Sequence, residues 1–200
     1  MKHKKNKPKK ILKTVLIIVA AVALLVAIYP YAPKIWYLLY KPKIDSAPYE
    51  QASSSNSPLP SEVSRPGNRL VLPQIGVNAQ IYESESVNIL DSHNGVWLDP
   101  ATNNPTEPGN MVIAGHRFQY RPQISNFFYN LVEIKNGNVI YVVWDNKVYD
   151  YKVYDIQTID PTQTDIRNND PQIKHKLTLY TCTPLGSTSK RYVVMAAEII

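Results

Sequence analysis

Three residues that could together carry out acyl transfer stand near the ends of predicted strands. Cys182, the only cysteine of the 200-residue chain, ends the apolar segment 177–182. His116 closely follows the apolar segment 111–114, and Arg191 begins another. A thiolate can attack a carbonyl carbon while a histidine protonates the leaving amine, and a fixed cation can stabilise both the thiolate and the oxyanion. The three positions predict catalysis through sulfur if the fold brings them together.

Each of these residues also has a purely structural interpretation. A lone cysteine is more often a small buried apolar residue than a nucleophile. A strand-end histidine is often structural, and Arg191, beside Lys190, fits an ordinary surface charge. Two observations favour chemistry. An unpaired thiol on an exported domain is exposed to oxidation, and pairing of the strands that flank the loop 183–190 would place Arg191 within reach of the sulfur.

The other three histidines are weaker partners for the thiol. His3 belongs to the basic N-terminus, and His93 lies in Asp-Ser-His-Asn-Gly, a predicted turn. His175 stands between two lysines, where a solvated turn is expected. His116 is therefore the predicted partner of the cysteine.

Composition excludes several classes of protein. A single cysteine excludes an internal disulfide framework and a zinc site built mainly from thiolates. The acids Glu83, Glu85 and Asp91 are scattered as in a solvated loop, so we predict neither a metal nor a cofactor. Seven lysines lie within the first thirteen residues, and removing them from the net charge of +6 leaves −1. A nucleic-acid-binding body is therefore not expected.

Residues 14–32 are predicted to form one membrane-spanning helix. From Val15 to Ile28 every residue is apolar, and a helix of this length matches the hydrocarbon thickness. The basic tail, residues 1–13, would stay cytoplasmic under the positive-inside rule, which places the rest of the chain outside the cell. A cleaved signal peptide is the alternative, and prolines beside the small residue at the outer end disfavour it.

Residues 33–68 are predicted to contain an interfacial segment and a linker. Tyrosines and a tryptophan between residues 29 and 40 are typical of an outer-interface aromatic belt. Residues 42–68 are rich in serine and proline and show no periodicity, which predicts a semi-extended linker. Whether this linker folds back over an active site is left open.

Residues 69–200 show the pattern of a mainly β domain. Apolar and alternating runs predict strands at 70–81 (interrupted at 73–76), 111–114, 140–144, 148–156, 177–182 and 192–196. One helix is expected around Ile124–Val132, where Phe127, Phe128 and Leu131 have helical spacing. The pattern predicts a closed antiparallel barrel or a sandwich.

Several of these segments resemble the sortases, which are membrane-anchored cysteine transpeptidases of Gram-positive-type cell surfaces. Thr178–Cys182 resembles their TLxTC strand, and Ala114–Arg117 resembles their catalytic-histidine segment. Arg191 falls where their catalytic arginine follows the cysteine. Leu72–Val77 is similar to their first barrel strand, and Asn130–Gly137 to the segment before their central hairpin. The resemblance covers about residues 70–200.

The resemblance implies an eight-stranded β-barrel of the sortase type with one or two short helices. It implies a hydrolase-class transpeptidase in which Cys182 attacks the Thr–Gly carbonyl of an LPxTG-like sorting signal. His116 would protonate the leaving amine and deprotonate the incoming one, and Arg191 would position the substrate and stabilise the oxyanion. Thr181 and Thr183 are predicted to contact the substrate. The implied partners are surface proteins with C-terminal sorting signals and an amine of a cell-wall precursor or another surface protein.

The subclass and two other functions remain open at this stage. The segment Thr181–Gly186 resembles the TCTPxG pattern of pilus-type and housekeeping-like sortases. Asp45–Tyr49 does not match the Asp-Pro-aromatic lid of pilus enzymes, which favours protein anchoring over pilus polymerisation. The alternatives from other classes are a membrane-tethered β-domain that only binds a partner, and a cysteine L,D-transpeptidase acting on peptidoglycan.

Overall fold

The structure is a computed structural model that describes residues 7–40, 43–61, 63–118 and 127–199. The α-helices are α1 (Lys7–Ile28), α2 (Ala32–Tyr40) and α3 (Ala47–Ser55), and the 3-10 helices are η1 (Tyr29–Tyr31), η2 (Pro73–Ile75), η3 (Val87–Asp91), η4 (Leu131–Glu133) and η5 (Asp165–Arg167). The strands are β1 (Arg69–Leu72), β2 (Val77–Glu83), β3 (Gly95–Leu98), β4 (Gly109–Ala114), β5 (Val139–Trp144), β6 (Lys147–Ile159), β7 (His175–Thr183) and β8 (Lys190–Glu198).

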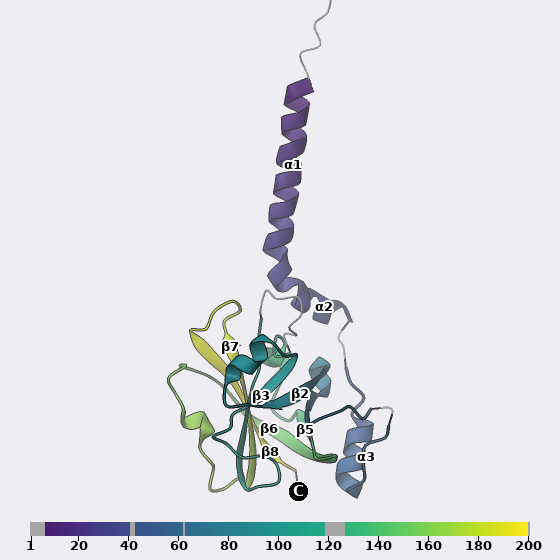
Figure 1. The fold of residues 1–200 in the computed structure, drawn as a ribbon, viewed down its shortest axis with the longest axis vertical. Coiled ribbons are helices and arrows are strands. Elements are labelled where there is room, and N and C mark those ends of the chain that lie inside the picture. Colours follow the sequence, from purple (N-terminus) through teal and green to yellow (C-terminus); the bar gives the residue numbers. More distant parts are fainter. Residues whose placement is uncertain (1–6, 41–42, 62, 119–126, 200) are drawn as a thin grey trace, which may run out of the picture.

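The eight strands close into a barrel in the order β1-β2-β3-β4-β7-β8-β6-β5, with β5 pairing back onto β1 (Figure 1). The predicted closed eight-stranded barrel is confirmed. The expectation of an antiparallel barrel is wrong at two places, because β2 pairs with β3 and β4 pairs with β7 in parallel. The β4–β7 pair joins segments far apart in the sequence, and it is the pair that builds the site described below.

The predicted strand at 70–81 is two strands. β1 and β2 run antiparallel with Leu72 opposite Val77, and η2 reverses the chain between them. Gly76 has a φ of 68°, which a glycine adopts without steric cost, and Pro73 suits the first position of the turn. The apolar alternation on both sides of the turn arises because both strands face the same core.

The predicted helix at Ile124–Val132 is not an α-helix where the structure describes it. Residues 127–130 form a turn and η4 follows, whereas 124–126 lie outside the described residues. Phe128 and Leu131 are fully buried in the barrel core. Their spacing therefore reflects a turn that closes one end of the barrel.

The hairpin of β5 and β6 confirms its prediction. Asp145 and Asn146 join the two strands with φ values of 48° and 64°, as a two-residue turn matched to the twist of the strands requires. Along β6, Tyr151 and Val153 point into the core while Lys152 is exposed.

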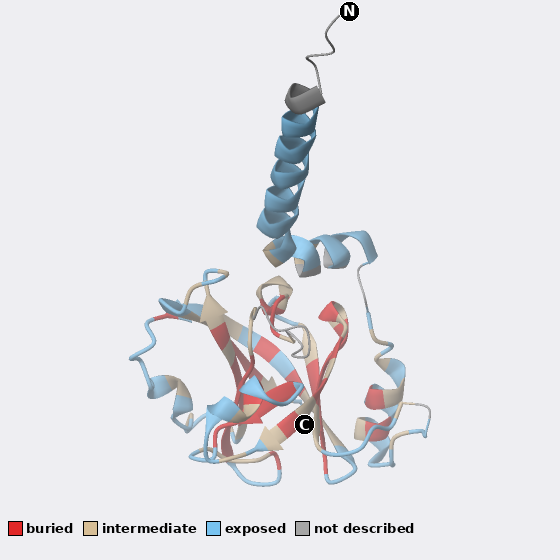
Figure 2. Ribbon diagram, turned by 45° about the horizontal axis from the view of Figure 1, so that its top comes forward, coloured by how far each residue is buried: buried red, intermediate tan, exposed pale blue. Residues whose placement is uncertain are grey.

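The Ser/Pro-rich segment contains a helix, so the expectation of a semi-extended linker is wrong at α3. Tyr49 is 1% exposed, and its ring stacks on Tyr141 of β5 with centroids 5.4 Å apart. Ala52 is also buried, and the Ser53 hydroxyl donates to the carboxylate of Asp150. Aromatic burial thus holds α3 against the outer face of the barrel (Figure 2).

The N-terminal helices lie outside the barrel. The helical stretch Lys10–Tyr31 is long and apolar enough to cross a membrane by length and composition, and none of it is buried. After η1 the chain turns, and α2 runs crosswise to α1 between that helix and the barrel (Figure 2).

Candidate active site

The two neighbours of β7 bring the predicted residues together. β7 and β8 are antiparallel with Cys182 directly opposite Arg191. β4 and β7 are parallel with Ala114 opposite Tyr180, and the backbone N–H of Gly115 still donates to the Tyr180 carbonyl at 3.3 Å. Two residues beyond that pair, His116 and Cys182 lie beside one another, so the cysteine has the histidine on one flank and the arginine on the other.

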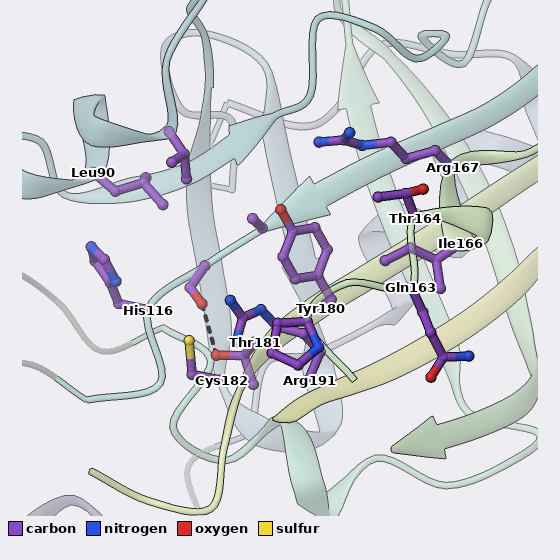
Figure 3. Close-up of a pocket in the computed structure, with 14 residues that line it drawn as sticks. Leu90, His116, Gln163, Thr164, Ile166, Arg167, Tyr180, Thr181, Cys182 and Arg191 are labelled. Atoms are coloured by element: carbon purple, nitrogen blue, oxygen red, sulfur yellow. Dashed lines mark hydrogen bonds between the residues drawn. The ribbon is translucent and has the colours of Figure 1, made fainter. Parts of the chain in front are cut away.

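One cavity of about 290 Å³ is lined by all three residues (Figure 3). Cys182 is partly buried and belongs to none of the apolar clusters of the described residues. Much of the remaining wall is apolar: Val87, Leu90, Ala114, Pro161, Ile166 and Tyr180. The cavity can hold an extended apolar segment of a peptide against the thiol.

Close packing fixes the loop that carries the histidine. A Cβ on Gly115 would lie 2.6 Å from a ring carbon of Phe128, so any larger residue would displace that ring. The Thr181 hydroxyl donates to the Gly115 carbonyl at 2.7 Å, and the Phe128 N–H donates to the His116 carbonyl at 3.2 Å (Figure 3). The backbone on both sides of the imidazole is therefore bonded to the barrel.

Asp91 is a member of this site that the sequence did not reveal. Its carboxylate lies 3.5 Å from Nε2 of His116 and forms an ion pair when the imidazole is protonated. The sequence suggested only a solvated acid, and Glu83 and Glu85 do border a different hollow. Asp91 is positioned by η3, a 3-10 helix that no periodicity in the sequence predicted.

A second cation, Arg117, lies beside the cysteine. Its Nη1 donates to the Thr183 hydroxyl at 2.6 Å, and its buried Nε has no hydrogen-bond partner among the described residues. Burial lowers the pKa of Arg117, whereas the nearby ionisable groups of Tyr129, Tyr192 and Cys182 raise it. The guanidinium of Arg117 thus places a positive charge next to the end of β7 that carries Cys182. Its only signal in the sequence was its position directly after the histidine.

The three remaining predicted residues occupy different surroundings. Arg191 donates from Nη1 to the carbonyls of Thr188 and Lys190, which anchors its guanidinium to the loop after β7. Thr181 lines the cavity, but its hydroxyl proton is used by Gly115. Thr183 is not among the described residues that line the cavity, and its hydroxyl accepts from Arg117.

A half-buried ion pair supports the opposite wall. Asp99, whose side chain is 3% exposed, lies 2.6 Å from Nε of Arg167, a cavity residue in the loop between β6 and β7. The side chain of Asn110 donates to the carbonyls of Ile166 and Asn168 in the same loop. The sequence gave no sign of this network because its members are far apart along the chain.

His93 and His175 do not line the cavity. His93 is exposed, with its ring edge-on to Tyr82 at 5.0 Å, and His3 lies outside the described residues. The predicted solvated turn at His175 is wrong, because this residue begins β7. Its side chain is 13% exposed, and its Nε2 lies 3.9 Å from the Glu198 carboxylate.

Comparison with known proteins agrees with this geometry. Residues 70–199 match the family model of the sortase domain. Among solved structures, sortase C1 of GBS pilus island 1 is 24% identical with a TM-score of 0.60, and the match covers 66% of this chain and 64% of that one. The Clostridium perfringens sortase D5 transpeptidase is 30% identical, with a TM-score of 0.56 and coverage of 66% and 78%. Sortase C-1 from Actinomyces oris is 27% identical, with a TM-score of 0.59 and coverage of 77% and 96%. A search of curated proteins gave no match.

Proposed function

Because the chain belongs to the sortase family, we propose that it is a cysteine transpeptidase that cleaves an LPxTG-like sorting signal between Thr and Gly. The observation that carries the proposal is the placement of Cys182 between His116 and Arg191 on one cavity. The acyl group would pass to an amine of the cell wall or of another surface protein. The domain would act outside the cell, behind a cytoplasmic tail (1–13), a membrane anchor (14–32) and the segment 33–68.

In the first half-reaction the sulfur of Cys182 attacks the threonine carbonyl carbon. The carbonyl oxygen gains negative charge, and the guanidinium of Arg191 on the neighbouring strand stabilises it. The C–N bond then breaks, and His116 gives its proton to the departing glycine amine. A thioester between Cys182 and the threonine carbonyl remains.

In the second half-reaction an acceptor amine attacks the thioester carbon. His116 takes a proton from this amine, the C–S bond breaks, and Cys182 leaves as a thiolate. The new amide joins the surface protein to the acceptor, and the histidine is protonated again for the next cycle. Asp91, 3.5 Å from Nε2, stabilises the imidazolium between cycles.

The apolar wall of the cavity would bind the apolar leucine and proline that begin an LPxTG-like motif. The side chains of Val87, Leu90 and Ile166 can exclude water around a leucine and a proline of the peptide. Arg167 and Gln163 also line the cavity and offer polar groups to the peptide backbone.

The test is acyl transfer by the full-length protein in detergent, with a panel of LPxTG-type peptides and a nucleophilic amine. Intact-mass spectrometry should detect a thioester adduct on the wild-type protein and none on Cys182→Ala. His116→Ala should lower turnover by about 100-fold or more, since general acid–base catalysis contributes this much. His93→Ala is the matched control, because that histidine is exposed and outside the cavity.

Two outcomes would contradict the proposal. One is a thiol that alkylates readily but forms no adduct with any peptide of the panel. The other is full transfer activity in Cys182→Ala, which would show that the cysteine is structural and that the reaction does not pass through it.

A further inference from the structure

The helix α2 presents an apolar face that the barrel does not cover. Its large apolar side chains are strongly exposed: Ile35 at 43%, Trp36 at 57%, Leu38 at 57%, Leu39 at 72% and Tyr40 at 63%. By contrast α3, of the same length, buries Tyr49 and Ala52 against the barrel. Exposed apolar surface of this density marks a contact with a membrane or another molecule.

The helix repeat separates this apolar face from the side that contacts the barrel. Residues 35, 36, 39 and 40 fall on one side of the helix, and Lys34 falls roughly opposite the centre of that side. Lys34 is the residue that reaches the barrel, through an ion pair with Glu133 of η4. The apolar face therefore points away from the catalytic domain.

Continuity of the chain identifies what covers this face. α2 follows the apolar helix α1 after only the three residues of η1, and it runs crosswise to α1 (Figure 2). A helix that leaves the outer end of a membrane span at such an angle lies along the bilayer surface. Tryptophan and tyrosine are the side chains that favour the headgroup region. Here the rings of Trp36 and Tyr40 are in contact, with centroids 4.0 Å apart and planes tilted by 32°.

The barrel side of this segment is bonded to the part of the domain that carries the active site. The Tyr129 hydroxyl donates to the Pro30 carbonyl at 3.0 Å. Phe128, the residue before Tyr129, donates its N–H to the His116 carbonyl. A row of ring contacts, Tyr29 on Phe118 and Phe118 on Tyr129, runs along the same junction. The end of the membrane helix is thus linked to the loop of the histidine.

We propose that α2 is a membrane-interface helix whose apolar face rests among lipid headgroups. The Lys34–Glu133 pair on its other side and the Pro30–Tyr129 hydrogen bond from η1 hold the active-site end of the barrel against the outer leaflet. The cavity is then fixed at the depth where a peptide emerges from the membrane. The proposed lipid contact depends only on the geometry of α2. The proposed effect on a peptide that emerges from the membrane rests in addition on the proposed function.

The lipid contact is tested with the native tryptophans of the full-length protein in vesicles of phosphatidylcholine and phosphatidylglycerol. Trp97 and Trp144, the other two tryptophans, are each 5% exposed within the barrel domain. The difference in fluorescence emission between the wild-type protein and Trp36→Phe therefore reports the surroundings of α2. We expect lipids with a nitroxide on the headgroup or at the start of the acyl chain to quench this emission more than lipids with a deep nitroxide.

Three results would overturn the lipid contact. Quenching by aqueous acrylamide but not by lipid nitroxides would place α2 in water. Protection from both would mean that a protein, such as a second copy of the chain, covers the face. Strongest quenching by the deep nitroxide would make α2 part of the span.

The docking contact is tested by charge reversal. Glu133→Lys should lower transfer from a sorting peptide anchored in the vesicle by roughly two- to fivefold, as expected for losing a partly exposed ion pair. Transfer from a soluble peptide should be unchanged, and Lys34→Glu with Glu133→Lys should restore the anchored reaction. Glu107→Lys is the control, because it makes the same charge change on an exposed loop.

The two readouts separate the hypotheses. Equal losses with both peptides would refute the docking role and leave the proposed function intact. Absence of all transfer by the wild-type protein would count against the proposed function, while the quenching result would still decide the lipid contact.

Discussion

At the scale of single residues, the environment of the thiol is set by charges from two directions. Arg191 lies opposite Cys182 on β8, and Arg117 reaches the next residue of β7 from the histidine loop. The imidazole of His116 lies 3.5 Å from the carboxylate of Asp91. The site thus has cations near the sulfur and an acid near the imidazole.

Arg117→Gln tests the role of the second cation. The substitution removes the charged hydrogen bond to the Thr183 hydroxyl and the positive charge next to Cys182, so the rate of Cys182 alkylation should fall by roughly two- to tenfold. The measurement is the rate of iodoacetamide modification at one fixed pH, with Arg65→Gln, an exposed arginine outside the cavity, as control. An unchanged rate would show that Arg117 does not affect the reactivity of the thiol.

At the scale of elements, the loop between β6 and β7 forms one wall of the cavity, and the barrel holds it from below. Asn110 of β4 accepts from the buried Thr178 hydroxyl and donates into the loop, and Asp99 pairs with Arg167. The loop is therefore attached to strands on both sides of the active site. Its position sets the width of the cavity.

Asp99→Asn should loosen this loop. The substitution removes the charge that pairs with Arg167, so hydrogen exchange in residues 160–170 should accelerate. We expect the KM for the peptide to rise with little change in kcat, because the catalytic strands are untouched. Asp165→Asn, an exposed acid in the same loop, should alter neither quantity. A fall in kcat at constant KM would contradict a role in binding.

Tyr49→Ala should detach α3 from the barrel. The substitution empties a fully buried aromatic position, which costs about 2–4 kcal/mol. Limited proteolysis should then cut within residues 52–57, and thermal unfolding should begin at lower temperature. Gln51→Ala, on the exposed side of the same helix, should leave both measurements unchanged. Since α3 contributes no described residue to the cavity, transfer activity should survive below the new unfolding temperature.

At the scale of the whole molecule, the chain is a basic tail, one apolar helix and a barrel whose active-site loop is bonded to the membrane-proximal segment. The seven lysines precede the apolar helix, and the remainder of the chain is close to neutral. This distribution favours an N-terminus inside the cell and a barrel outside it.

Membrane extraction tests this arrangement. The protein should resist release by alkaline carbonate and be solubilised by detergent, because a spanning helix stays in the bilayer unless lipid is replaced. Protease added to intact cells should reach the barrel, whereas an epitope before Lys7 should be protected. A mature protein found in the medium without residues 1–32 would instead identify a cleaved leader.

Local patterns in the sequence determined much of this protein. The length and polarity of the apolar helix, the short alternating strands, the β5–β6 hairpin and the three strand-end residues are visible in a few neighbouring residues each, because side-chain periodicity follows local backbone geometry. The sortase motifs were visible for the same reason, since each is only four or five residues long. Packing overrode the pattern at α3, where the burial of Tyr49 turns a polar linker into a docked helix.

Only the tertiary structure decided how these pieces meet. The parallel pairing of β4 with β7 places His116 beside Cys182, and the same folding brings Asp91, Arg117 and the Asp99–Arg167 pair around them. Pairing between distant strands depends on the closure of the whole barrel. Residues that form ion pairs across the barrel follow no periodic pattern in the sequence. The residue types proposed for catalysis could therefore be selected from the sequence, whereas the charges that surround them and the contact of the barrel with the N-terminal helices could not.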